Sequence, residues 1–129
     1  MRIIFIDNSI NFTANSLNLK ALDSLQKILI HFSTELARNN HEVIFYNKTE
    51  KDKEEMGVLW KQLKNLVKDY SDILIAVQDT ELLNYSIKTK IKFLLLHYKI
   101  ENQLNKELLI KLLRQKVCLL YTNNYVVNS

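Results

Sequence analysis

The sequence predicts an α/β domain with a mostly parallel sheet of about five strands and helices on both faces. Short apolar runs recur along the chain, and several segments between them carry apolar residues at helical spacing. The runs themselves are nearly continuous in apolar residues, which is typical of strands covered on both faces in a parallel sheet. The five predicted strands occupy residues 2–6, 41–46, 73–77, 92–97 and 117–121.

The segments between the strands predict the helices. The first helix ends near residues 37–40, and its apolar face is formed by Leu25, Ile28, Leu29, Phe32 and Leu36. A second helical stripe, with Trp60 beside it, is formed by Val58, Leu59, Leu63, Leu66, Val67 and Tyr70. Asp79 or Thr80 can cap a short helix that runs through Tyr85. A last helix is marked by Leu104, Leu108, Leu109 and Leu112.

Length and composition limit the classes of protein. A chain of 129 residues corresponds to one domain, and 47% hydrophobic with 25% charged residues is ordinary for a globular protein. The chain has one Gly and no Pro, where average usage would give roughly nine and six. This deficit excludes a Gly-rich phosphate loop, because only glycine lets backbone amides approach a phosphate without an intervening Cβ.

The net charge of +4 is mildly basic. Lysines would share the second predicted helix face or alternate ahead of the fourth strand: Lys61, Lys64, Lys68, Lys88, Lys90 and Lys92. Such groups can attract anionic lipid or nucleic acid, but the sequence favours ordinary solvated faces opposite apolar ones.

Cysteine usage and the chain start suggest an intracellular protein. Cys118 stands alone, which excludes an intramolecular disulfide, and its apolar neighbours predict a small buried side chain. The opening apolar run is short and ends at Asp7, unlike a signal peptide. We therefore expect a cytoplasmic protein.

Two segments carry a resemblance to a known family. Residues 21–24 read Ala-Leu-Asp-Ser, and residues 36–43 read Leu-Ala-Arg-Asn-Asn-His-Glu-Val. With the strand and loop ahead of them, they resemble the amino-terminal lobe of family 4-like bacterial glycosyltransferases, which have two Rossmann-like lobes (the GT-B fold). That lobe typically opens with a strand, a loop ending in paired glycines, a helix, and an (Arg/Asn)-(Gly/Asn)-His-Glu-Val lead into the second strand. Here Asp23 and Ser24 stand where the family usually has the two glycines.

The resemblance implies a function for the whole chain. Residues 1–129 would be a single Rossmann-like, acceptor-side lobe, apparently truncated before the second lobe. Completed by that lobe, in the same chain or in trans, it would transfer a sugar from a nucleotide sugar to a glycan or lipid acceptor of a cell-envelope polysaccharide. No metal, cofactor or nucleic acid is implied, and contact with the inner face of the membrane is compatible with such acceptors. The isolated chain is expected to have little or no transferase activity.

His97 is the predicted catalytic residue. It ends the fourth predicted strand, so it would lie at the carboxyl edge of the sheet, facing the cleft between lobes. A histidine there can exchange a proton with a bound hydroxyl or phosphate near neutral pH. The alternative is a structural histidine that hydrogen-bonds neighbouring backbone.

The loop over residues 7–23 is the second candidate, because long loops inside compact domains are usually functional or disordered. Its Asn8, Asn11 and Asn15 are the predicted acceptor-binding residues, since amides hydrogen-bond sugar hydroxyls. In the relatives, the helix after this loop directs its amino end at the donor diphosphate. Asp23 and Ser24 occupy that position here, where the carboxylate should impair phosphate binding and can serve instead as an N-cap.

Other functional classes fit less well. A phosphoacceptor receiver domain needs a Lys at the end of its fifth strand, where this chain has Tyr121-Thr122-Asn123. A flavin or dinucleotide binder needs glycines that are absent here. The main alternative is a non-catalytic, degenerate lobe that acts as a carbohydrate- or protein-binding module.

Overall fold

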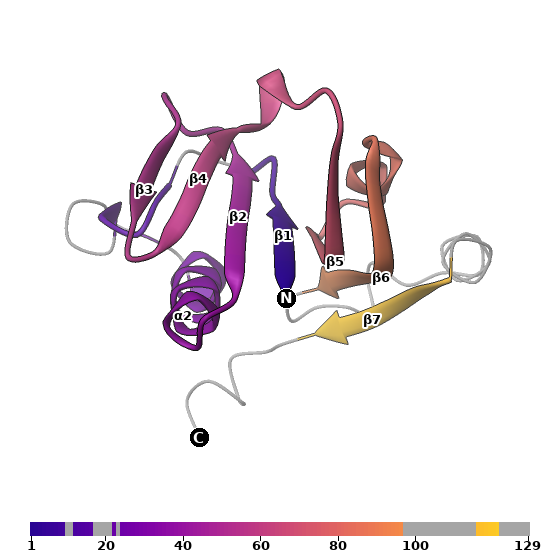
Figure 1. The fold of residues 1–129 in the computed structure, drawn as a ribbon, viewed down its shortest axis with the longest axis horizontal. Coiled ribbons are helices and arrows are strands. Elements are labelled where there is room, and N and C mark those ends of the chain that lie inside the picture. Colours follow the sequence, from indigo (N-terminus) through magenta and orange to yellow (C-terminus); the bar gives the residue numbers. More distant parts are fainter. Residues whose placement is uncertain (10–11, 17–21, 23, 97–115, 122–129) are drawn as a thin grey trace.

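The computed structural model describes residues 1–9, 12–16, 22, 24–96 and 116–121, which form a seven-stranded sheet with one α-helix (Figure 1). The strands are β1 (Arg2–Ile6), β2 (Glu42–Asn47), β3 (Lys53–Glu55), β4 (Val58–Gln62), β5 (Asp69–Val77), β6 (Ile87–Leu96) and β7 (Val117–Tyr121). The helices are α2 (Ser24–Arg38) and the 3-10 helices η1 (Leu63–Asn65) and η2 (Thr80–Asn84). The predicted α/β class with a mostly parallel sheet is confirmed, whereas the described sheet has seven strands instead of five.

The strand order places β1 inside the sheet. The order is β3-β4-β2-β1-β5-β6-β7, and every neighbouring pair is parallel except β3 and β4. Numbered along the chain, the parallel strands therefore follow the order 3-2-1-4-5-6, which is that of a doubly wound sheet. The direction of winding reverses between β1 and β5, and in such sheets ligands bind beyond the carboxyl ends of the strands at that point.

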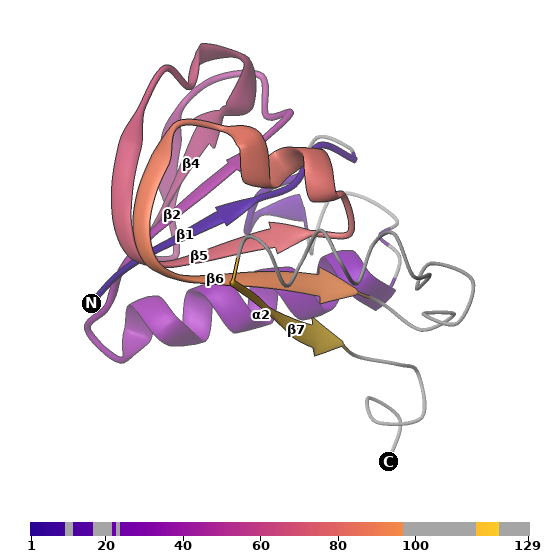
Figure 2. The same cartoon turned by 90° about the vertical axis from the view of Figure 1, so that its right-hand side faces the viewer.

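Helix α2 covers one face of the sheet, as predicted (Figure 2). Its Leu25, Leu29 and Ile30 are buried in a cluster with side chains of β1, β2 and β4. Phe32 of α2 also contacts Phe5 of β1 in a T-shaped arrangement, with the ring centroids 5.5 Å apart. Phe32 nevertheless remains 37% exposed. Apolar side chains spaced for a helix thus make the predicted contact with the sheet.

The end of α2 is a Schellman motif. The backbone N–H of Asn40 donates to the carbonyl of Ala37, and that of His41 donates to the carbonyl of Leu36. Asn40 has the left-handed φ of 69° that this motif requires at its penultimate position, where Asn substitutes for the usual Gly. Glu42 then accepts from Arg2 as β2 begins. The Arg-Asn-Asn-His-Glu-Val segment therefore has a structural explanation of its own.

The opposite face carries no α-helix among the described residues, so the prediction of helices on both faces is not confirmed. β5 pairs with β1 only from Ile73 onward, while its first residues, from Asp69, pair with β6 alone. The first halves of β5 and β6 bend away from α2, and η2 lies on the same side of the sheet as these bent halves (Figure 2). Leu82 and Leu83 of η2 are buried there in a second apolar cluster, on the side of the sheet away from α2. The other buried residues of this second cluster are Ile4, Ile6, Ile44, Tyr46, Leu63, Leu74, Ala76, Ile87, Leu94 and Leu96.

The predicted helix over residues 58–70 is wrong. These residues form β4, η1 and the start of β5, so Lys61, Lys64 and Lys68 share no helix face. Val58 and Trp60 are fully buried on the α2 side, while Leu59 packs against the second cluster. A strand with apolar side chains on both faces looks continuous in sequence, and periodicity alone does not separate it from a buried helix.

The remaining predicted strands are confirmed within β5, β6 and β7, although residue 97 lies outside the described part of the chain. The short helix capped by Asp79 corresponds to η2, since the Asp79 side chain accepts from the N–H of Glu81. Cys118 is exposed on β7, so the prediction of a buried thiol is wrong. The predicted helix around residues 104–112 lies outside the described residues.

The hairpin between β3 and β4 gives a test of the fold. Its two turn residues, Met56 and Gly57, have φ of 54° and 80°, as a type I′ turn requires. A Cβ on Gly57 would lie 3.2 Å from the Cβ of Ala37 in α2. Gly57→Ala should therefore lower the free energy of unfolding by about 1 kcal/mol or more, measured by urea denaturation. Met56→Gly is the matched control and should leave stability unchanged or raised; a Gly57→Ala variant as stable as wild type would contradict this turn.

Candidate functional site

Polar residues follow four neighbouring parallel strands at one edge of the sheet. Asp7 directly follows β1, Asn47 ends β2, Gln62 ends β4, and Asp79 is the second residue after β5. The strand registers pair Ile6 with Tyr46 and Ala76, and Tyr46 with Lys61, so these ends lie level. They form the carboxyl edge, where a doubly wound sheet binds its ligands.

Asn8 and Asp79 bridge the point where the winding reverses. The Asn8 side-chain amide donates to Oδ2 of Asp79 at 3.0 Å, linking the loop after β1 to the loop after β5. The other oxygen of Asp79 accepts from the N–H of Glu81 at 2.9 Å and so caps η2. Both residues are half-buried. We refer to Asn8 and Asp79 together as the switch-point pair.

The backbone around this pair is held firmly. The N–H of Asp7 donates to the carbonyl of Tyr46 at 3.0 Å, and the buried Asp7 carboxylate accepts from the N–H of Ser9 at 2.9 Å. Gln78 has a left-handed φ of 62°, and its N–H donates to the carbonyl of Leu95. The loops after β1 and β5 are thus tied to β2 and β6, which orients Asn8 and Asp79 before any ligand arrives.

The structure does not bring Asn15 to Asn8. Both the backbone and the side-chain amide of Asn15 donate to the carboxylate of Glu55, at 3.1 and 2.8 Å. Glu55 belongs to β3 at the edge of the sheet, separated from β1 by β4 and β2. Partial burial raises the pKa of Glu55, but hydrogen bonds from Thr13 and Asn15 and the charge of Lys53 outweigh it, and the net pKa lies below the usual value. Asn15 is therefore engaged as a partner of Glu55, and Asn11 lies outside the described residues.

Part of the long loop is packed as core. Phe12 is fully buried against Phe45 and Trp60, and its carbonyl accepts from the side-chain amide of Asn47 at 2.6 Å. The Thr13 N–H donates to the hydroxyl of Ser16 at 2.9 Å. The length of the loop therefore reflects packing over β2 and β4 as well as any role at the carboxyl edge.

Ser24 is the first residue of α2 and is half-buried. Because α2 ends at Arg38, shortly before β2 starts at the opposite edge, its first turn lies toward the carboxyl edge (Figure 2). Asp23 and His97 lie outside the described residues. The buried Leu96 ends β6 directly before His97.

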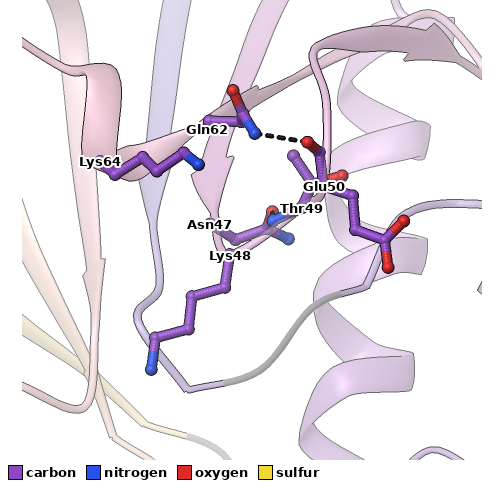
Figure 3. Close-up of a pocket in the computed structure, with 6 residues that line it drawn as sticks. All are labelled: Asn47, Lys48, Thr49, Glu50, Gln62 and Lys64. Carbon is purple, nitrogen blue, oxygen red and sulfur yellow. Dashed lines mark hydrogen bonds between the residues drawn. The ribbon is translucent and has the colours of Figure 1, made fainter.

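A pocket of about 350 Å³ opens at the ends of β2 and β4 (Figure 3). We call it the edge pocket; its lining residues are Asn47, Lys48, Thr49, Glu50, Gln62 and Lys64. The carboxylate of Glu50 lies on the opposite side of the pocket from both lysine ammonium groups (Figure 3). Composition and periodicity did not single out these residues as a site. The feature that could have identified them is their position, since several of them end or follow parallel strands.

Comparisons with known protein families, curated proteins and solved structures give no match for this chain. Among the described residues, no three His, Cys, Asp or Glu side chains lie close enough to hold a metal ion. In the same part of the chain, no helix is both long and apolar enough to cross a bilayer.

Proposed function

We propose that the chain binds a hydroxyl-rich ligand, a glycan or sugar-lipid acceptor, at the carboxyl edge beside the switch-point pair. Completed by a second lobe, it would serve as the acceptor-side lobe of a nucleotide-sugar-dependent glycosyltransferase. The observation that carries this proposal is the hydrogen bond between Asn8 and Asp79 across the reversal of winding. The resemblance of residues 21–24 and 36–43 supports it less, because the later segment is explained by the end of α2.

The chemistry of the pair suits a sugar. An amide offers both donors and an acceptor, and an ionised carboxylate offers acceptors for hydroxyl protons. Adjacent hydroxyls of a sugar can hydrogen-bond both groups without a formal charge on the ligand. In the proposed enzyme, this side would orient the acceptor hydroxyl, and catalysis would come from positioning and from stabilising the departing diphosphate. His97, directly after β6, remains the proposed group for proton transfer.

A non-catalytic binding module is the second candidate. The single glycine of the chain lies in the β3–β4 turn, so the start of α2 has no glycine to admit a diphosphate. Incubating the purified chain with nucleotide sugars and glycan acceptors separates the two candidates. Turnover that is lost in His97→Ala supports a transferase, and binding without turnover supports the module.

Variants of the switch-point pair test the binding site itself. We expect Asp79→Asn to weaken binding of neutral oligosaccharides about tenfold or more, because a hydrogen bond to a charged group contributes roughly 1.5 kcal/mol or more. Asn8→Ala should weaken it about fivefold, because a neutral hydrogen bond contributes about 1 kcal/mol. Saturation-transfer NMR against a panel of oligosaccharides measures the effect. Asn84→Ala is the matched control: its amide donates to Glu81 on the exposed side of η2 and should not matter. Unchanged binding in both pair variants would refute the proposed site.

A further inference from the structure

The edge pocket has a rigid frame. Asn47 is fully buried, its amide donates to the carbonyl of Phe12 at 2.6 Å, and its Oδ1 accepts from the N–H of Thr49 at 2.9 Å. On the other wall, the Gln62 amide donates to the carbonyl of Glu50, joining the segment after β2 to the end of β4 (Figure 3). The Gln62 amide thus joins the two sides of the pocket, and the Asn47 amide fixes the start of the segment after β2.

The ammonium groups of the pocket are not used in this way. Three other described lysines have partners: Lys53 pairs with Glu55 at 3.4 Å, Lys90 pairs with Asp72 at 3.2 Å, and Lys61 lies over the Tyr46 ring. Others, such as Lys27 and Lys88, form no ion pair among the described residues. Among the described residues, neither Lys48 nor Lys64 forms an ion pair. The Glu50 carboxylate points to the far side of the pocket (Figure 3). Lys48 directly follows β2 and Lys64 lies in η1, so two positive charges without an ion-pair partner line the pocket. In Figure 3 the Lys64 ammonium lies near Gln62, whereas the Lys48 side chain extends away from it.

We propose that the edge pocket is a binding site for a phosphomonoester, and that the flexible side chains of Lys48 and Lys64, which both line the pocket, turn to contact the phosphate. A phosphomonoester carries a charge of about −1.5 to −2 at neutral pH, and a carboxylate carries −1. Two ammonium groups therefore match the charge of a phosphomonoester better than that of a carboxylate. A volume of about 350 Å³ lies at the small end of ligand pockets, so the pocket admits a compact molecule such as a sugar phosphate. The site does not depend on sugar transfer, since it uses neither the switch-point pair nor a second lobe.

An NMR titration tests this site. Inorganic phosphate is added to ¹⁵N-labelled protein at constant ionic strength, and backbone amide shifts are followed. We expect saturable shifts centred on Lys48, Thr49, Gln62 and Lys64. The double variant Lys48→Ala/Lys64→Ala should weaken binding about tenfold or more, because both charged contacts are lost. The control Lys27→Ala/Lys88→Ala changes the net charge equally, on α2 and β6, and should bind phosphate as wild type does.

A second pair of probes identifies the ligand class. Glucose 1-phosphate should bind at the same amides at least as tightly as inorganic phosphate, whereas glucose should not shift them. Two results would overturn the proposal: amide shifts that do not saturate with phosphate, or an equal loss of phosphate binding in the two double variants. Either result would indicate a general attraction of phosphate to surface lysines. Loss of oligosaccharide binding in Asn8→Ala with phosphate binding retained would separate this site from the proposed acceptor site. Wild-type circular dichroism in the lysine variants confirms that they fold.

Discussion

Trp60→Ala is expected to lower the free energy of unfolding by about 3–5 kcal/mol, the usual cost of truncating a fully buried large aromatic side chain. Trp60 is fully buried in β4 and stacks on Phe45, with ring centroids 4.8 Å apart and an interplanar angle of 23°. Its ring also packs against Phe12, and its N–H donates to the carbonyl of Glu55 at 3.3 Å. A cavity at this point would loosen β4, the loop after β1 and the β3–β4 hairpin together.

Urea denaturation monitored by far-UV circular dichroism measures this loss of stability. Tryptophan fluorescence cannot be used, because Trp60 is the only tryptophan of the chain. Phe32→Ala is the matched control: its ring is 37% exposed, so its removal should cost clearly less, about 1–2 kcal/mol. The same comparison tests the strand. Had residues 58–70 formed the predicted helix, Trp60 would flank its apolar stripe, and the two substitutions should cost similar amounts.

Asp69→Ala is expected to cost about 2–3 kcal/mol at neutral pH, because it leaves two partly buried donors without their acceptor. Oδ1 of Asp69 accepts from the guanidinium of Arg2 at 2.8 Å, and Oδ2 accepts from the hydroxyl of Tyr46 at 2.5 Å. Arg2 lies on β1 and Tyr46 on β2, so Asp69 fastens the bent start of β5 to the centre of the sheet. Burial and this hydrogen bond raise the pKa of Tyr46, which keeps its hydroxyl protonated as a donor at neutral pH.

The cost should depend on pH. Partial burial raises the pKa of Asp69, but the hydrogen bonds from Tyr46 and Arg2 outweigh it, so the folded-state pKa lies below the usual value. A carboxylate whose pKa falls on folding stabilises the protein above its unfolded pKa of about 3.9, and this contribution disappears as pH falls through the folded pKa. The difference in unfolding free energy between wild type and Asp69→Ala should therefore shrink as the pH falls below about 4.

Glu42→Ala provides the control for the Asp69 experiment. Glu42 pairs with the same guanidinium, but its side chain is 61% exposed, and exposed ion pairs contribute at most about 1 kcal/mol. We expect Glu42→Ala to change stability by less than Asp69→Ala at pH 7. Equal costs for the two variants, or a cost of Asp69→Ala that is the same at pH 7 and pH 3, would contradict the assigned role of Asp69.

The described residues from β1 through β2 form the predicted elements, because local signals there agree with the tertiary contacts. The apolar side chains of α2 are spaced for a helix, and its last turn ends with a motif that Asn40 can complete. Residues 58–70 fail for the opposite reason: β4 buries Val58 and Trp60 on one face and packs Leu59 on the other, which removes the alternation that identifies a strand. The sequence does not show that the bent halves of β5 and β6 cover the second face of the sheet. That arrangement depends on which residues of β5 and β6 pair with each other and with β1.

The sequence predicted where the candidate site lies better than it predicted which residues form it. A loop after the first strand of a parallel sheet predicts a carboxyl-edge site, and Asn8 lies there. The partnership of Asn8 with Asp79 and that of Asn15 with Glu55 join residues 71 and 40 positions apart. Such long-range contacts depend on strand order, which hydrophobic periodicity does not encode. The edge pocket was missed for the same reason.

The sequence by itself determined that this chain is an α/β domain with buried strands, one amphipathic helix ahead of the second strand, and no glycine-rich phosphate loop. Those properties follow from local spacing and composition. Only the tertiary structure decided that β1 lies inside the sheet, that the winding reverses beside Asn8 and Asp79, and that Lys48 and Lys64 line one pocket. The physical reason is that parallel strands meet their neighbours through long crossovers, so their order and the side chains gathered at their ends are set by packing of the whole sheet.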